Sequence, residues 1–363
     1  MSVASEVVMQ YVVDLEYTDR HAVGRVGGKN ANLGELLHSG IRVPPGFAVT
    51  VDGYLHFLEA TGLGVKLHEL LRDVCPDDQE CLDQISGEIR RVILEAEIPQ
   101  AIAAELRANY EALASKCCRE DIPVAVRSSA TAEDLPSASF AGQQDTYLWI
   151  QGPDEVARSM LRCWSSLFNA RAISYRVIND FPHEKVHMSV GVQKMVNAKA
   201  AGVMFTLNPA NGDLSQVLIE GNWGLGETVA SGEVTPDQFR VDKISYEVNE
   251  RHISHKHIEC VPDPVGRGAR EVPLDPDRQD ASCLTNEEIR ELARIARLIE
   301  NHYGAPQDIE WAIDKDLPFP DNVFIVQARP ETVWSQKKPE PLLSGKTAMD
   351  LVMQRAMQTI KFS

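Results

Sequence analysis

Apolar residues in the first half of the chain recur mostly at helical spacing. They do so just after the glycines of "VGRVGGKNANLGELLHSG", which predicts a glycine turn followed by a helix. Helical spacing continues through residues 54–117 and returns at 154–176, where the apolar side chains fall on one face. Between these stretches, "IPVAV" and "YLWI" are predicted to be short strands. The first half should therefore consist mainly of helices around a few strands.

The second half has a different pattern. Short runs, β-branched or alternating between apolar and polar residues, are separated by Gly, Asn, Asp and Pro, which predicts a mixed or antiparallel sheet. One helix follows, because Thr285 and Glu288 have capping-box spacing and Gly304 provides a stop. "DIEWAID" and "VFIVQARP" then predict a hairpin with a long polar loop. We predict an α+β fold with two lobes, residues 1–185 and 186–335.

The last stretch, residues 336–363, begins as a charged linker that contains proline. It continues with apolar residues on one face of an expected helix. Such a stripe must be buried somewhere, because an isolated short helix is marginal in water. Packing on its own domain and docking on another chain both satisfy this requirement, and the sequence leaves the two open.

Composition narrows the functional classes. The chain has 363 residues, 44% of them hydrophobic, which supplies a core for about two domains. Its 53 acidic residues outnumber 36 basic ones, and the net charge of -17 opposes binding to a nucleic acid backbone. The sequence shows no secretory signal and no run of about 18 apolar residues. We therefore expect a cytoplasmic protein that binds neither nucleic acid nor membrane.

The cysteines and histidines do not form a recognisable metal or disulfide pattern. The seven cysteines are odd in number and lack paired C-x-x-C spacing. His252, His255 and His257 are close in sequence, but no thiolate or carboxylate completes a metal site. We expect buried or idle thiols and an exposed strand end.

Lys29 follows Gly27 and Gly28 at the predicted start of a helix. Backbone amides, the helix dipole and an ammonium group can converge there on an anion. The stretch is not a Walker A loop, because its glycine spacing differs and Asn30 stands where Ser or Thr would hold magnesium. A glycine turn with a solvated lysine is the alternative interpretation.

Arg127 would project from the end of the strand that begins at "VAV". A guanidinium there can hold phosphate oxygens in a fork. Residues 128–142 are mostly small, so their backbone N–H groups could approach phosphates closely as a lid. A plain Ser/Ala-rich surface loop is the alternative, but its length without secondary structure favours a lid.

The predicted hairpin supplies acidic groups. Asp308 and Glu310 are two residues apart on one strand and point to the same face, as do Gln327 and Arg329 on the next. If the strands pair, two carboxylates and an amide oxygen share one face, and such oxygens hold magnesium on a nucleotide. Alternating surface charges on an edge hairpin are the alternative.

Taken together, these motifs resemble a known family, the ATP-grasp nucleotide-binding domain of phosphoenolpyruvate synthase, pyruvate phosphate dikinase and rifampicin phosphotransferase. The similar segments run in family order from about residue 20 to 333. They are "VGGKNANLGEL", "VPPGFAVT", "VAVRSSATAEDLPSASFAGQQDTYL", "AAGVMFTLNP", "WGLGETVASGEVTPDQF" and "DIEWAID...IVQARPET". The resemblance implies an ATP-grasp fold whose two lobes hold the nucleotide in the cleft between them.

The resemblance also implies residue roles. Lys29, Arg127 and Arg329 would bind the ATP phosphates and act in catalysis. Gly142 and Thr146 would line the flap and nucleotide pocket, and Gln193 would lie near the adenine.

The same carry-over implies a metal site. Glu310 and Gln327 would contact ATP through Mg²⁺, with Asp308 as a further ligand. Glu220 would be a second-tier contributor. The implied cofactors are ATP and Mg²⁺.

Members of the resembled family pass a phosphoryl group from ATP to a histidine on a swivelling domain and then to an acceptor, releasing AMP. No loop of the expected histidine type is found in this sequence, so we expect a partner subunit that carries the histidine and the acceptor site. By domain content the chain resembles the ATP-binding subunit of phenylphosphate synthase, which implies phenol as acceptor.

Two other functions stay open on the sequence. The chain could be the N-terminal part of a phosphoenolpyruvate synthase or rifampicin phosphotransferase, acting on pyruvate or antibiotic. A non-catalytic ATP-sensing or assembly subunit is the alternative from another class, although its signature would be loss of Lys29, Arg127 or Glu310.

Overall fold

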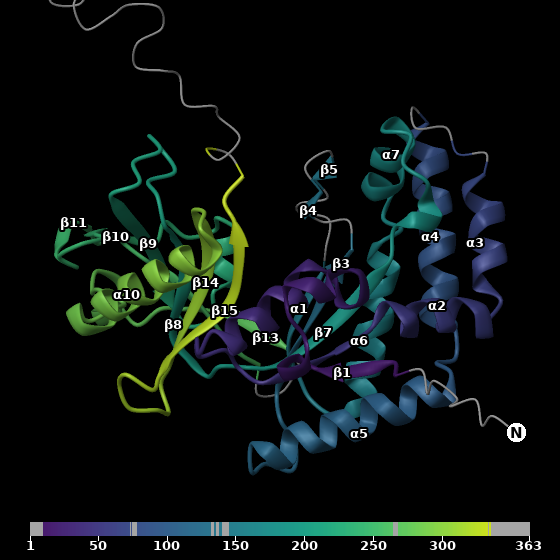
Figure 1. Cartoon of the computed structure of the whole chain (residues 1–363), viewed down its shortest axis with the longest axis horizontal. Coiled ribbons are helices and arrows are strands. Elements are labelled where there is room, and N and C mark those ends of the chain that lie inside the picture. Colours follow the sequence, from purple (N-terminus) through teal and green to yellow (C-terminus); the bar gives the residue numbers. More distant parts are fainter. Residues whose placement is uncertain are drawn as a thin grey trace, which may run out of the picture.

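The fold is seen in a computed structural model that describes residues 10–332 and Trp334, apart from 73, 75–77, 132–133, 136–137, 140–144 and 264–267. Two antiparallel sheets lie side by side, with helices around the first and one long helix on the second (Figure 1). This arrangement confirms the predicted α+β class. The predicted tail, residues 336–363, lies outside the described residues.

The first sheet has the strand order β1-β2-β7-β3-β6. Every neighbouring pair in it is antiparallel. The strands are β1 (Val12–Asp14), β2 (Gly46–Val49), β3 (Val124–Ala130), β6 (Thr146–Ile150) and β7 (Met188–Lys194).

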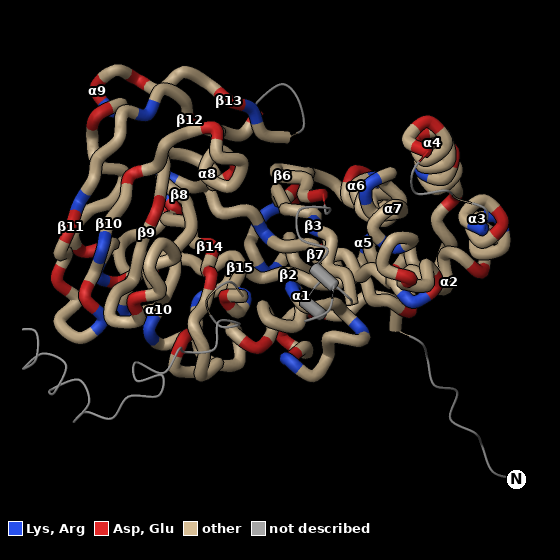
Figure 2. The backbone as a smooth tube through the Cα atoms, turned by 90° about the horizontal axis from the view of Figure 1, so that it is seen from above, with Lys and Arg blue, Asp and Glu red and all other residues tan. Residues whose placement is uncertain are grey.

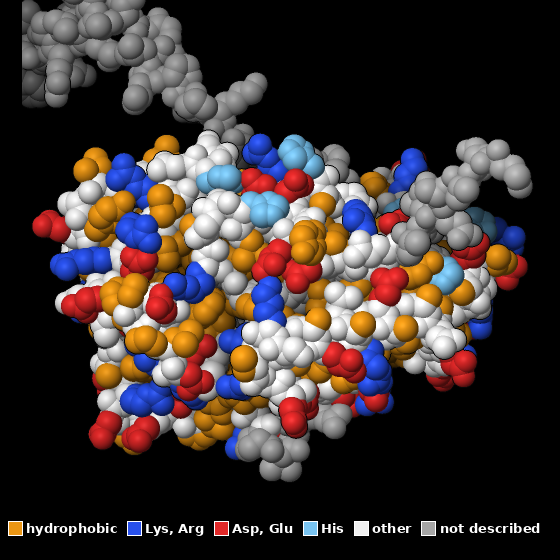
Figure 3. Space-filling view, turned by 60° about the horizontal axis from the view of Figure 1, so that its bottom comes forward, with side chains coloured by type: hydrophobic (Ala, Val, Ile, Leu, Met, Phe, Trp, Pro, Cys, Tyr) orange, Lys and Arg blue, Asp and Glu red, His pale blue; other side chains and the backbone are white. Residues whose placement is uncertain are grey.

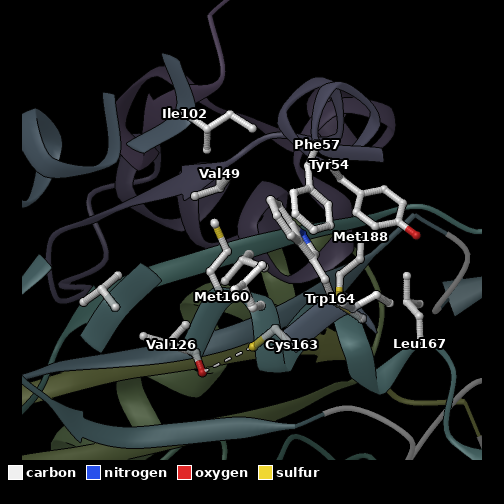
Figure 4. Packing of buried hydrophobic residues seen from close by; sticks show 14 of the residues in the cluster. Val49, Tyr54, Phe57, Ile102, Val126, Met160, Cys163, Trp164, Leu167 and Met188 are labelled. Atoms are coloured by element: carbon white, nitrogen blue, oxygen red, sulfur yellow. Dashed lines mark hydrogen bonds between the residues drawn. The ribbon is translucent and has the colours of Figure 1, made fainter. Parts of the chain in front are cut away.

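Helices pack against the first sheet and bury a large apolar core. They are α2 (Val51–Ala60), α3 (Leu63–Leu71), α4 (Gln79–Glu95), α5 (Gln100–Lys116), α6 (Pro153–Ser166) and α7 (Ala170–Ile178). Figure 4 shows Trp164 of α6 in the middle of this core, beside Tyr54, Phe57 and Met160. The first lobe is therefore stabilised mainly by apolar burial between α2, α6 and the sheet.

The predicted helix at 154–176 is two helices. α6 ends at Ser166, and α7 starts after Asn169, whose side chain accepts a hydrogen bond from the Ala172 amide. Apolar periodicity continues across the break, since Leu167 and Phe168 are buried between the two helices. The single-helix prediction was wrong because the N-cap signal of Asn169 was overlooked.

The second sheet has the order β11-β10-β9-β8-β14-β15 and is antiparallel throughout. This confirms the predicted sheet in the second half and the hairpin of its last two strands. The strands are β8 (Ala198–Phe205), β9 (Gln216–Trp223), β10 (Asp237–Asp242), β11 (Val248–His252), β14 (Gln307–Asp314) and β15 (Val323–Pro330).

Helix α10 (Asn286–Tyr303) covers one face of the second sheet. Its capping box joins Thr285 and Glu288, and it ends at Gly304 in the left-handed region, as predicted. Smaller elements complete the described chain. They are β4 (Asp134–Leu135), β5 (Ala138–Ser139), β12 (Ile258–Pro262), β13 (Ala269–Pro273), α8 (Glu227–Ala230), α9 (Pro276–Gln279) and three short 3₁₀ turns at Leu15–Tyr17, Arg20–Ala22 and His183–Lys185.

Helix α1 (Val23–His38) lies between the sheets and contacts β3, β7 and β15 (Figure 1). Its apolar side chains Val26, Leu33 and Leu36 join the core of the second sheet. A segment from the start of the sequence thus packs with the C-terminal strands.

The change from one sheet to the other falls later than the predicted boundary at residue 185. β7 pairs with β2 and β3 and is the central strand of the first sheet, so the crossing occurs between Lys194 and Ala198. The apolar run of β7 is buried on both faces and looks like the strands that follow it. Composition alone therefore placed it in the wrong lobe.

Charge is distributed without a single dominant sign over the face in Figure 3, where acidic and basic side chains alternate among apolar ones. Within the part of the chain that the structure describes, no helix combines the length and apolar character that crossing a bilayer requires.

Candidate functional site

A cavity of about 620 Å³ opens between the two sheets. This is within the usual size range of small-molecule sites, about 300–1,000 Å³. The first sheet contributes residues of β3, β6 and β7, and the second contributes β8, β14 and β15, with α8 at one side. The connection Lys194, Met195 and Val196, which crosses from β7 to β8, also lines the cavity.

Part of the cavity wall is apolar. Val196, Ala201 and Ala312 are buried in a small cluster on the cavity side of the second sheet. Small side chains here leave space for an apolar ring, and charged side chains, among them Arg127 and Glu310, line the same cavity. The cavity therefore suits a ligand with one apolar and one strongly charged end.

The glycine turn before Lys29 is built into α1. Gly27 has φ 73° and ψ 167°, so the helix is interrupted there and restarts with Lys29 in its first turn. A β-carbon on Gly27 would lie 2.1 Å from the carbonyl oxygen of Ser129. Only glycine allows the turn to approach β3 this closely. The predicted glycine turn is confirmed, although one helical turn precedes it.

Asn30 fixes this turn against the first sheet. Its backbone N–H donates to Ser129 Oγ at 3.3 Å, and its side-chain amide donates to Val26 O at 3.0 Å and to Ser189 Oγ at 3.1 Å. The Asn30 side chain is almost fully buried. One N–H of the new helix is thus already used by the protein, and Lys29 carries the positive charge of the turn.

Arg127 projects from the middle of β3 across to the second sheet; the prediction that it lies at the strand's end was wrong, because β3 continues to Ala130. Its Nη2 donates to Glu310 Oε2 at 2.7 Å and to Gln327 Oε1 at 3.0 Å, and its Nη1 donates to Val326 O at 3.0 Å. The Arg127 side chain is 16% exposed and that of Glu310 is 34% exposed. Figure 2 shows β3, β7, α1 and β15 meeting in the middle of the molecule.

The register of the second sheet aligns several polar side chains. Gln238, Glu220, Val203, Glu310 and Gln327 are direct partners along five neighbouring strands, so they share one face. Glu220 accepts a hydrogen bond from Gln238 at 2.7 Å and is two strands, about 10 Å, from Glu310. It shares the face of Glu310 but is not among the residues that line the cavity.

Asp308 and Arg329 form a second pair on this hairpin. They are cross-strand partners, and Arg329 Nε and Nη2 donate to Asp308 Oδ2 at 2.8 and 2.7 Å. Together with the pairing of Glu310 and Gln327, this confirms that the four side chains share one sheet face, as their alternation predicted.

The two carboxylates differ electrostatically. Burial raises the pKa of Glu310, but the charge and hydrogen bond of Arg127, with the charges of Lys29 and Arg329, outweigh it and leave the pKa below its usual value. Burial raises the pKa of Asp308 above its usual value, and Arg329 offsets only part of this. Glu310 is therefore the more strongly anionic group beside the cations.

This donor set fits magnesium. Glu310 Oε2 and Gln327 Oε1 converge on one nitrogen of Arg127, so a carboxylate and an amide oxygen point to one place. Magnesium commonly takes one or two protein oxygens and completes its shell with substrate phosphates and water. Among the residues that the structure describes, no group of three or more His, Cys, Asp or Glu could hold a metal by itself.

Other residues implied by the resemblance lie at different places. Thr146 and Gln193 line the cavity, and the Gln193 amide donates to Pro44 O at 3.2 Å. Gly142 and about half of the predicted lid lie outside the described residues, and β4 and β5 form a short hairpin in the rest. The lid and the roles of these residues stay predictions.

Three cavity residues were missed from the sequence. Asp145 follows the predicted lid and accepts a hydrogen bond from the Tyr147 hydroxyl at 2.9 Å, and Glu227 lines the cavity from α8. Burial and the charge of Asp145 raise the pKa of Tyr147, which stays protonated as donor. The acid of "GQQDTY" and the acid of "GLGE" were the available signals.

Comparison with known proteins adds a family. The family described as "Pyruvate phosphate dikinase, AMP/ATP-binding domain" matches residues 23–348. A probable phosphoenolpyruvate synthase of Staphylothermus marinus is 49% identical over 350 residues, covering 91% of this chain and 42% of that protein.

Two further relatives give the same picture. A probable phosphoenolpyruvate synthase of Methanothermobacter thermautotrophicus is 44% identical, over 92% of this chain and 48% of that protein. The phosphoenolpyruvate synthase of Pseudomonas aeruginosa is 45% identical, over 91% and 43%. The chain spans less than half the length of these relatives.

Proposed function

Because the chain belongs to the pyruvate phosphate dikinase AMP/ATP-binding domain family, we propose that it binds ATP for a phosphoenolpyruvate synthase-type phosphotransferase. In this function ATP gives up both outer phosphates: the β-phosphoryl group passes to a histidine on another domain or subunit, the γ-phosphate is released to water as inorganic phosphate, and AMP leaves. The histidine then passes its phosphoryl group to pyruvate, the final acceptor. Since the function depends on ATP, we propose a cytoplasmic place of action.

The observation that carries this proposal is the contact of Arg127 with Glu310 and Gln327 beside the cavity. It gathers a phosphate-binding cation and two oxygen atoms suited to Mg²⁺ beside a cavity whose wall is partly apolar. Phosphoryl transfer asks a protein mainly for positioning and charge neutralisation. Lys29, Arg127 and Arg329 would hold phosphates, and Glu310, Gln327 and Asp308 would hold Mg²⁺, which neutralises phosphate charge when bound.

The names of the relatives favour pyruvate over phenol. The phenylphosphate synthase interpretation rested on domain content and on no phenol-specific residue, whereas the three relatives described above are named phosphoenolpyruvate synthases. We therefore propose phosphoryl transfer of the phosphoenolpyruvate synthase type, which the sequence left open as an alternative, as the main function.

The test mixes the chain with its histidine-bearing partner and ATP labelled at the β position, and offers pyruvate, phenol and rifampicin separately. Label on the partner histidine with AMP release supports the proposal. Loss of that label on addition of pyruvate, but not of phenol or rifampicin, identifies pyruvate as the acceptor. Label retained only in nucleotide would support an ATP-sensing subunit instead.

Variants connect this activity to the site. Arg127→Ala and Glu310→Ala should each lower AMP formation by orders of magnitude. Arg42→Ala is the matched control, because Arg42 pairs with Asp321 on the surface, where both side chains are largely exposed. Turnover at the wild-type rate in both site variants would refute the assignment of these residues.

A further inference from the structure

Arg127 lies where two oxygen ligands converge. Its Nη2 is within hydrogen-bond distance of both Glu310 Oε2 and Gln327 Oε1, at 2.7 and 3.0 Å. These are the two oxygens that the proposed function gives to Mg²⁺. A guanidinium nitrogen and a divalent cation cannot occupy one place between them at the same time.

Glu310 has the complementary position. Its carboxylate lies against Arg127 and in the field of Lys29, the two cations that the proposed function gives to the ATP phosphates. A protein carboxylate thus neutralises the cations that the proposed function gives to phosphate. Phosphates can reach Arg127 Nη2 only if Glu310 gives it up.

We propose that Arg127 and Glu310 form an exchangeable ion pair that makes the binding of divalent cation and ATP mutually dependent. When both ligands bind, Glu310 and Gln327 turn from Arg127 to the cation, and Arg127 turns from them to phosphate. Either ligand alone breaks the pair and leaves one charge without a partner. This inference rests on the proposed ATP-binding function and adds its regulation.

The remaining contacts of Arg127 suit such an exchange. Nη1 is held by Val326 O at 3.0 Å, a bond that involves neither Glu310 nor Gln327 and can keep the guanidinium in place. Nε is buried and has no hydrogen-bond partner among the described residues. A buried unsatisfied donor is costly, so a phosphate oxygen that rotation brings within its reach would relieve it.

The partial exposure of the pair allows it to open. The Glu310 side chain is 34% exposed, so its carboxylate can rotate toward solvent or a cation while its strand stays in place. Gln327, by contrast, is almost fully buried and offers a fixed oxygen. Coupling between two ligands that bias one element is typically about 5- to 150-fold in affinity, and we expect a value in this range.

The test measures affinity for each ligand alone. ATP is titrated by calorimetry in EDTA and again with Mg²⁺, and Mn²⁺ is titrated without nucleotide by electron paramagnetic resonance. Glu310→Gln should bind metal-free ATP about tenfold more tightly than the wild type and lose most of the Mg²⁺ enhancement, because Arg127 is no longer occupied. Arg127→Met should bind Mn²⁺ alone more tightly, because the two oxygens are freed.

A matched control separates exchange from simple charge removal. Glu250 on β11 pairs with Arg240 on β10 of the same sheet, where both side chains are exposed to solvent. Neither residue has a proposed role in binding, so Glu250→Gln removes one negative charge without freeing a phosphate-binding cation. It should change metal-free ATP affinity less than about twofold.

The outcomes are distinct. If the wild-type chain binds ATP but Glu310→Gln binds metal-free ATP no more tightly than the wild type, the exchange is overturned and the proposed function stands. A chain that binds no ATP under any condition overturns the proposed function itself. If Glu310→Gln fails to fold, the Mn²⁺ affinity of Arg127→Met decides, and a value at or below wild type overturns the exchange.

Discussion

Replacing Gly27 with alanine should both destabilise the chain and misplace Lys29. The added β-carbon would lie 2.1 Å from Ser129 O and 2.3 Å from Ser129 Oγ, at a residue with φ 73°. Backbone strain costs about 1–3 kcal/mol and overpacking about 1–3 kcal/mol, so we expect a loss of about 2–6 kcal/mol in the free energy of unfolding.

The same clash has a consequence for binding. To restore an ordinary contact with Ser129, the turn must move about 1 Å away from β3, carrying Lys29 with it while Arg127 stays on the strand. A displacement of about 1 Å can cost about 100-fold in a positioned site. We expect ATP to bind at least about tenfold more weakly, and adenosine, which lacks phosphates, to bind as before.

Gly24→Ala is the control in the same helix. A β-carbon there meets nothing within 4 Å, and Gly24 has no positive φ, so alanine should stabilise the helix by about 0.5–1 kcal/mol. Urea denaturation followed by circular dichroism gives the stability, and calorimetry with Mg-ATP and adenosine gives the binding. The reasoning would be refuted if Gly27→Ala had the same free energy of unfolding and the same affinity for Mg-ATP as Gly24→Ala.

Other predictions concern stability. His183 accepts a hydrogen bond from Arg176 Nε at 2.9 Å, and burial with the Arg176 charge lowers its pKa from 6.5 to about 4. The unfolded chain therefore binds more protons between these values, and the free energy of unfolding should fall as pH drops from 6.5 to 4, by about 1 kcal/mol after solvent screening. His183→Gln should flatten this fall in urea titrations at pH 7.5 and 5; an unchanged slope would contradict it. Lys256→Met should cost about 3–5 kcal/mol, because the fully buried Asp237 carboxylate, 2.6 Å from Lys256 Nζ, loses its cation. Adding Asp237→Asn should recover part of the thermal stability, and no recovery would argue against a charge effect.

Local patterns made part of the site predictable from the sequence. Side chains two apart on a strand share a face, so the shared face of Asp308 and Glu310 follows from spacing alone. The pairing of β14 with β15 also follows, because the two strands are neighbours in sequence and form a hairpin. These predictions needed no knowledge of the rest of the fold.

Long-range placement could not be predicted in the same way. Arg127 and Glu310 are 183 residues apart, and their contact depends on how one sheet is set against the other. The sequence grouped β7 with the strands of the second half for a related reason, since its buried apolar run carries no information about its partners in the first sheet. Hydrophobic periodicity specifies an element but not the strand beside it.

The small residues around Arg127 explain why the sequence that follows it resembles a plain Ser/Ala-rich loop. Arg127 pairs with Gly191 across β3 and β7, and the Asn30 oxygen lies 2.2 Å from where a β-carbon of Gly191 would be. Asn30 thus fills the space that Gly191 leaves directly beside Arg127, while Ser129, two residues further along β3, accepts its N–H. Glycine and serine occur here because the turn that carries Lys29 must sit against the backbone that carries Arg127. The distance between the two cations is therefore set by residues that bind no phosphate themselves.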